Sequence, residues 1–149
     1  MFSMKVFISQ PMANKTFDEI EIERNLMIHV IGCVYAEEEI EIVDSLFTDV
    51  DVKAEQRESV GALWFLGKSI QAMDEADIVI MGVNWQHARG CRIEHEIAID
   101  YDKQVLPYWT IERKYREMLA KEKKSDCCGE CENKFNESEN SSCNSEQEA

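Results

Sequence analysis

Residues 76–83 read ADIVIMGV, and every residue from Ile78 to Val83 is apolar or glycine. A short, continuous apolar run of this kind is typical of a strand buried on both faces, as in the centre of a parallel sheet. The runs KVFIS at 5–9 and QVLPYW at 104–109 have a similar character, and EIEIV at 39–43 alternates with period two. We therefore expect four strands along the chain.

Helical patterns separate these strands. TFDE at 16–19 fits a capping box, and apolar residues follow it at helical spacing to about Tyr35. The other segments are assigned to helices over 62–76, 91–102 and 111–124 and to a polar loop over 48–59. Strands that alternate with helices predict a three-layer α/β sandwich, with a flavodoxin-like parallel sheet of four to five strands and helices on both faces.

In such sheets, ligands bind at the carboxyl ends of the strands, where the strand order reverses. In the flavodoxin-like order, this switch point lies between the first and third strands. The segments that leave those strands are SQPM at 9–12 and the loop at 83–90. These two segments are where we expect a ligand site.

The charge of the chain excludes some partners. The 149 residues include 16 Lys and Arg against 30 Asp and Glu, which gives a net charge of −14. Such an acidic protein is not expected to bind the phosphate backbone of nucleic acids. No apolar run is long enough for a membrane span, and the start MFSMKVFIS is unlike a secretory signal. We expect a cytoplasmic protein that binds neither nucleic acid nor membrane.

Residues 125–149 differ in composition from the rest of the chain. They hold seven acidic residues, one lysine and one aromatic residue. So little apolar surface cannot offset the entropy lost on ordering. We expect residues 1–124 to form one domain and residues 125–149 to form a disordered acidic tail.

Four of the six cysteines lie in this tail, and Cys128 and Cys131 form a C-x-x-C pair. A structural zinc site normally needs a second ligand pair, and no histidine follows. We therefore expect reduced cysteines and no metal site.

The segment after residue 83 carries further motifs. The strand beginning Ala76-Asp77 is followed by a loop with Arg89-Gly90, by EHEIA at 94–98 and by Lys103. This order resembles the nucleoside 2-deoxyribosyltransferase and nucleotide N-hydrolase superfamily, and KVFISQPM at 5–12 is similar to its first strand and substrate loop. LWFLGKSI at 63–70, Trp85 and ARGCRIEHEIA at 88–98 resemble an uncharacterised bacterial and phage branch.

The resemblance covers residues 4 to about 110. It implies cleavage of the N-glycosidic bond of a nucleoside or nucleotide, by hydrolysis or by 2-deoxyribosyl transfer, without a cofactor. It also implies a homo-oligomer, because enzymes of this family complete their sites across subunit interfaces.

Glu94 matches the family's nucleophile. We expect it in the first turn of its helix, where the helix dipole and unpaired N–H groups favour an ionised carboxylate. A glutamate at that position also fits a residue that only caps the helix; the resemblance favours the nucleophile. His95 and Glu96 are neighbouring candidates, but Glu96 points about 200° away around the helix.

Other residues are candidates for substrate binding. Arg89 flanks Gly90, and its guanidinium and the amides of the following helix suit a phosphate, although Arg89 also fits ordinary surface pairing. The ring of Trp85 suits stacking on a base. The first loop offers further contacts to sugar or phosphate, through Ser9, Gln10, Met12 and Asn14.

Two positions depart from the family pattern. The aspartate that transferases carry six residues before the nucleophile is here Ala88, and the acidic residue expected eight before Asp77 is Ser69. Asp74, one turn away, is a candidate substitute. These departures support an alternative function, a non-catalytic nucleotide-binding module with a degenerate active site.

The apolar residues of 62–76 generate a first prediction. Leu63, Trp64, Phe65 and Leu66 are consecutive, so they span more of the helix circumference than one sheet contact covers. We expect the surplus face to be buried in a symmetric dimer. Light scattering on residues 1–124 should give the dimer mass with unchanged thermal stability, and a stable monomer would contradict the expectation.

Overall fold

The computed structural model describes residues 3–47, 51, 53 and 59–131. The chain divides into two compact units, Met1–Tyr115 and Arg116–Ala149. The sheet, the cleft and all the candidate site residues belong to the first unit.

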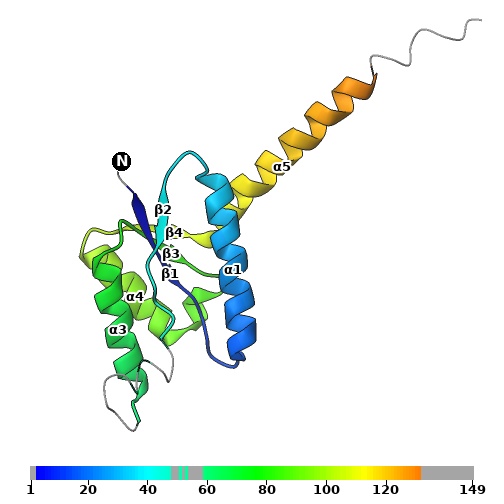
Figure 1. Ribbon diagram of the computed structural model, residues 1–149. Coiled ribbons are helices and arrows are strands. Elements are labelled where there is room, and N and C mark those ends of the chain that lie inside the picture. Colours follow the sequence, from blue (N-terminus) through cyan, green and yellow to red (C-terminus); the bar gives the residue numbers. More distant parts are fainter. Residues whose placement is uncertain (1–2, 48–50, 52, 54–58, 132–149) are drawn as a thin grey trace, which may run out of the picture. The chain divides into compact units, whose positions relative to one another are not determined.

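The first unit contains a four-stranded, fully parallel sheet with strand order β2-β1-β3-β4 (Figure 1). The strands are β1 (Met4–Ser9), β2 (Ile40–Ile42), β3 (Ile78–Met81) and β4 (Gln104–Pro107). The three-layer α/β class and the flavodoxin-like order are confirmed, and the switch point lies between β1 and β3. β4 is shorter than the expected strand at 104–109, because Tyr108 already starts a helix.

The described helices are α1 (Phe17–Val34), α3 (Ala62–Asp74), α4 (Arg89–Asp100) and α5 (Tyr108–Cys131), with a short 3-10 turn η1 (Trp85–His87). The capping box of α1 is confirmed: the Thr16 hydroxyl accepts from the Glu19 amide at 3.3 Å, and the Glu19 carboxylate accepts from the Thr16 amide at 2.7 Å. None of these helices combines the length and the apolar character that a bilayer span requires.

Several helix boundaries differ from those expected by two to seven residues, and two of these differences concern the site and the tail. α4 begins at Arg89, two residues before the expected start at Cys91. α5 runs from Tyr108 to Cys131, so residues 125–131, assigned from the sequence to the tail, have a helical backbone. Residues 132–149, and all of the expected loop at 48–59 except residues 51, 53 and 59, lie outside the described part of the chain.

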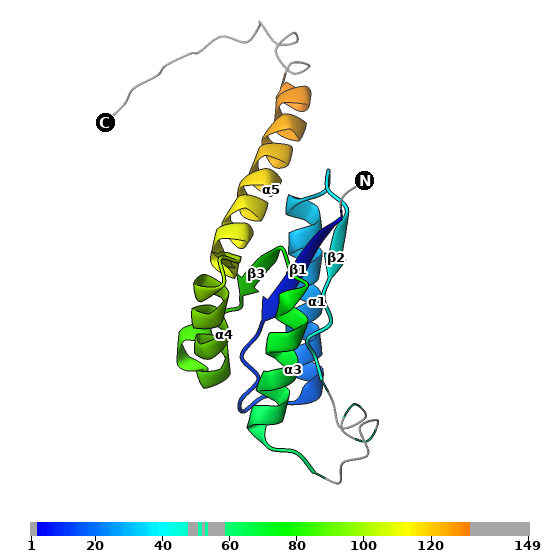
Figure 2. The ribbon, with the colours of Figure 1, turned by 90° about the vertical axis from the view of Figure 1, so that its left-hand side faces the viewer.

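Side chains from alternate strand positions form two separate cores. Val6, Ile8, Ile78 and Ile80 pack with α1 and with the first turn of α5. Residues of the opposite strand faces pack with α3 and α4, among them Phe7, Val79, Met81, Met73, Cys91 and Ala98. Because successive strand residues point to opposite faces, helices cover the sheet on both sides (Figure 2).

Gly82 fixes the contact between β1 and β3 at their carboxyl ends. Its amide donates to the Ser9 carbonyl at 2.8 Å. A Cβ atom on this residue would lie 3.0 Å from that same carbonyl oxygen and 3.4 Å from the Gln10 Cα. A Cβ atom here would require the backbone of β1 to move by a few tenths of an ångström, which would stretch this hydrogen bond, so glycine is favoured.

Gly82→Ala should therefore destabilise the protein by about 1–3 kcal/mol, because the added methyl group forces the two strand ends apart. Gly32 in α1 is a matched control, since a Cβ there meets nothing within 4 Å. Gly32→Ala should instead stabilise the helix by about 0.5–1 kcal/mol. Urea unfolding measures both changes, and equal effects of the two substitutions would contradict the assignment.

Candidate functional site

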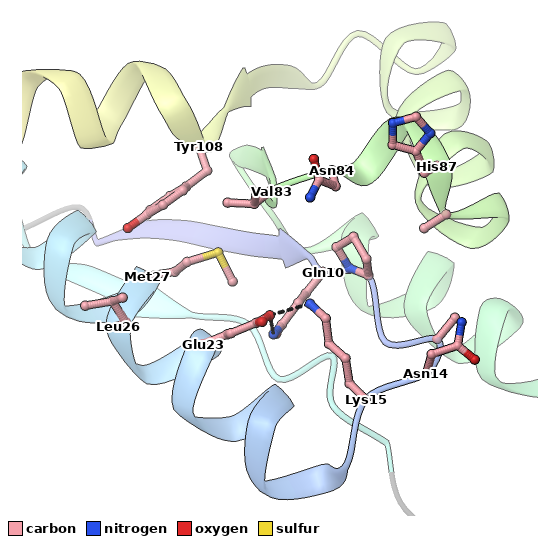
Figure 3. Close-up of a pocket in the computed structure, with 13 residues that line it drawn as sticks. Gln10, Asn14, Lys15, Glu23, Leu26, Met27, Val83, Asn84, His87 and Tyr108 are labelled. Atoms are coloured by element: carbon pink, nitrogen blue, oxygen red, sulfur yellow. Dashed lines mark hydrogen bonds and ion pairs between the residues drawn. The ribbon is translucent and has the colours of Figure 1, made fainter.

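A cleft of about 560 Å³ opens between the loops that follow β1 and β3 (Figure 3). One part of its wall is apolar and comes from Leu26, Met27, Val83 and Tyr108. The remaining wall is more polar and consists of Gln10, Pro11, Ala13, Asn14, Lys15, Glu23, Asn84, His87 and Ala88. The cleft therefore lies at the topological switch point, where the strand order predicts a ligand site.

The two loops share an unusual backbone feature. Asn14 and Asn84 both adopt the left-handed region, with φ of 63° and 60°. Asparagine tolerates this conformation better than other residues with a Cβ, because its short amide side chain can bond locally. Each loop thus turns sharply at an asparagine that also lines the cleft.

The charged groups of the cleft neutralise each other. The Lys15 ammonium lies 2.6 Å from the Glu23 carboxylate, and the Gln10 side-chain amide donates to the same carboxylate at 3.3 Å (Figure 3). The Gln10 amide nitrogen also donates to the Ile20 carbonyl at 2.9 Å, which fixes the orientation of the amide. The Gln10 amide oxygen is buried without a hydrogen-bond partner.

Glu94 does not line this cleft. Its side chain faces a smaller, separate space next to Ser9 at the end of β1. Glu94 is only 7% exposed. The Ser9 hydroxyl donates to its carboxylate, and Ser69, which is also buried, lies in the same small space. Ser9, Ser69 and Glu94 line a cavity of about 20 Å³, which is room for about one water molecule.

The reason expected for ionisation of Glu94 is wrong. Because α4 begins at Arg89, Glu94 lies in the second turn, beyond the reach of the helix dipole. Burial instead raises the pKa of Glu94 above its ordinary value, and the hydrogen bonds from Ser9 and Ser69 oppose this rise. The carboxyl group therefore depends on two hydroxyls for its stabilisation.

Arg24 is a buried cation that the sequence analysis missed. Its guanidinium donates to the Ser45 hydroxyl at 3.0 Å and to the Val43 carbonyl at 3.5 Å, and the side chain lines the same small cavity as Glu94. Burial lowers the pKa of Arg24. The available signal was its position four residues after Ile20 and three before Met27, which places an arginine on the buried stripe of α1.

The predicted binding residues separate into different surroundings. Ser9 and Met12 line the small cavity, Asn14 lines the cleft, and Gln10 lines both. Trp85 stacks on His95, with ring centroids 4.4 Å apart and planes inclined by 18°. Arg89 is exposed and Gly90 half-buried in the first turn of α4, outside the lining of the described cavities.

Two motif residues have structural roles. The Asp77 carboxylate accepts from the Lys5 backbone amide at 2.8 Å, which ties the start of β3 to β1. The Lys103 ammonium donates to the carbonyls of Asp74 and Ala76 at 2.7 and 2.9 Å, which are left over at the end of α3. Asp74 lines a separate pocket with Lys103, away from the cavity of Glu94.

Within the described part of the chain, no three His, Cys, Asp or Glu side chains are grouped as metal ligands would be. The tail cysteines lie outside the described side chains. Cys91 is buried against Ser9, and burial raises the pKa of its thiol to about 11.

Comparison with known proteins finds no match: no protein-family model, no curated protein and no solved structure matches this chain.

Burial of Glu94 predicts a pH-dependent stability difference. Its folded-state pKa lies above its ordinary value of 4.5, so the folded protein holds the proton more tightly than the unfolded chain. The associated stability is complete below pH 4.5 and is lost as the pH rises through the folded-state pKa. Glu94→Gln cannot ionise, so its free energy of unfolding should rise relative to wild type across that interval.

Urea unfolding from about pH 4 to pH 8 measures this difference. Glu96→Gln is the matched control, because Glu96 lies on the same helix with its side chain exposed to water. A difference between Glu94→Gln and wild type that does not change with pH would contradict the predicted linkage.

Proposed function

We propose that this chain cleaves the N-glycosidic bond of a nucleoside or nucleotide and that Glu94 is the nucleophile. The observation that carries the proposal is a buried carboxyl group beside the switch point, which accepts from Ser9 and shares a small cavity with Ser69. A buried carboxyl group with a displaced pKa next to a cleft is typical of functional sites.

In the proposed reaction, a Glu94 oxygen bonds to the anomeric carbon while the bond to the base breaks. The electron pair of that bond leaves with the base, which takes a proton from solvent. Water then attacks the anomeric carbon of the glycosyl ester and releases Glu94, whereas attack by a second base gives transfer. Burial makes the Glu94 carboxylate more basic and therefore a stronger nucleophile once it is ionised.

The cleft is the proposed place of the nucleoside. Its apolar wall suits a planar base, and Asn14, Asn84 and His87 offer hydrogen bonds to base or sugar. Met12 lines the Glu94 cavity and is itself 42% exposed to solvent. Movement of its flexible side chain is the proposed route by which the sugar reaches Glu94.

The remaining predicted contacts belong to the same proposal. Arg89, at the exposed start of α4, is assigned to a phosphate, together with the amide of Gly90. Trp85 has one ring face covered by His95, so a base would stack on the other face.

We also propose that the chain forms a homo-oligomer through α3. Leu63 on this helix is 81% exposed. Trp64 makes edge-to-face contacts with Phe65 and Phe47, at centroid distances of 5.0 and 6.5 Å. This arrangement leaves Leu63 as the apolar residue of the surplus face that a second subunit would cover.

A second candidate function is a nucleotide-binding module without catalysis. It is favoured by the separation of the cleft from Glu94, since the carboxylate of the cleft is Glu23, which is paired with Lys15. Ala88 and Ser69 also stand where acidic residues support catalysis in the family that the sequence resembles.

Release of free base from deoxynucleosides and their monophosphates distinguishes the two candidates. The wild type should release base, and Glu94→Gln should abolish the release because it removes the nucleophilic charge while preserving shape. Glu96→Gln should retain wild-type turnover, because its side chain is exposed on the same helix. Ligand binding without base release would support the module, and full turnover of Glu94→Gln would exclude Glu94 as nucleophile.

A further inference from the structure

The groups around Glu94 come from several elements. Ser9 lies at the end of β1, Ser69 lies on α3, and Cys91 lies one turn earlier on α4. Arg24 of α1 lines the same cavity but donates to Ser45 and Val43. Among the residues that line this cavity, Glu94 is the one carboxylate.

The hydrogen bond from Ser9 has a defined direction. The Ser9 hydroxyl donates to the Glu94 carboxylate, and the buried Cys91 thiol lies near the same hydroxyl. Because burial raises the pKa of Cys91 to about 11, its thiol stays neutral near neutral pH and does not compete as an anion for the Ser9 proton. The single hydroxyl proton of Ser9 is then free to point at the Glu94 carboxylate.

We propose that Ser69 is a positioning residue which, together with Ser9, holds the Glu94 carboxylate ionised and in one orientation. An acidic residue at position 69 would instead leave Glu94 sharing a proton with it. Two carboxylates facing each other in a buried cavity cannot both ionise readily. A serine hydroxyl at the same place donates to the ionised form and favours it. The role of Ser69 in catalysis rests on the proposed function, whereas its effect on the ionisation of Glu94 does not.

The test follows the ionisation of Glu94 directly. The full chain is labelled with 13C at the glutamate carboxyl groups and titrated by NMR, and Glu94→Gln identifies the signal of Glu94. Ser69→Ala should move the titration midpoint upward by about one to two pH units, a roughly 10- to 100-fold tighter hold on the proton. Ser69→Thr keeps the hydroxyl and should restore the wild-type midpoint.

Further variants make the result specific. Ser45→Ala removes a hydroxyl from the same cavity that donates to the Ile8 carbonyl and accepts from Arg24, so the Glu94 midpoint should stay in place. Ser69→Asp should raise the midpoint further than Ser69→Ala, because it adds a second carboxylate. If Ser69→Ala does not fold, Ser69→Cys keeps the volume with a weaker donor and should give a smaller upward shift.

An unchanged midpoint in the Ser69 variants, or equal shifts for Ser69→Ala and Ser45→Ala, would overturn the proposal. In a protein that releases base, the acid limb of the kcat/KM profile should move upward with the NMR midpoint. If no variant and no wild-type protein releases base, the proposed function fails, while the NMR titration still decides the role of Ser69.

Discussion

The pairing of β1 with β3 positions Ser9, Glu94 and the two loops that line the cleft. Ser9 is in register with Met81, and the next residue, Gly82, donates to the Ser9 carbonyl at a distance that leaves a Cβ atom only 3.0 Å from that oxygen. The segments that follow β1 and β3 separate immediately beyond this point, and the cleft opens between them. Because α4 starts seven residues after Gly82, the same junction brings Glu94 over the end of β1.

The burial of Glu94 is energetically unfavourable, and the groups that offset this penalty are neutral. Removing a carboxylate from water is unfavourable unless hydrogen bonds replace its hydration. Here two hydroxyls do so, and the rise in the pKa of Glu94 shows that burial outweighs them. Arg24 reaches the same cavity, but its guanidinium donates to Ser45 and Val43. The pKa of the Glu94 carboxyl group therefore lies closer to neutral pH than that of an exposed glutamate.

Much of the fold follows from local patterns, whereas the details of the site depend on tertiary packing. The apolar run 78–83 and the capping box at Thr16 identify a central strand and a helix start, because both signals are contained in a few neighbouring residues. The start of α4 at Arg89 was misplaced because no side chain caps this helix, so the sequence carries no local mark of its beginning. Ser69 was noticed only as a missing acid, since its contact with Glu94 joins α3 to α4 through burial that no local pattern encodes.

The motif residues differ in what the fold requires of them. Asp77 accepts a backbone hydrogen bond from β1, and Lys103 donates to two carbonyls at the end of α3, so both are explained by strand and helix termini alone. Ala98 is fully buried in the core beneath α4, where a small residue is needed. Glu94 is different, because its carboxylate accepts from the Ser9 side chain and shares a small cavity with Ser69. An apolar residue of similar volume would fill this buried position without the desolvation cost, so stability gives no reason for a carboxyl group there. Chemistry at the carboxyl end of β1 is the role that we propose for it, and the functional proposal therefore depends on this residue more than on the motif as a whole.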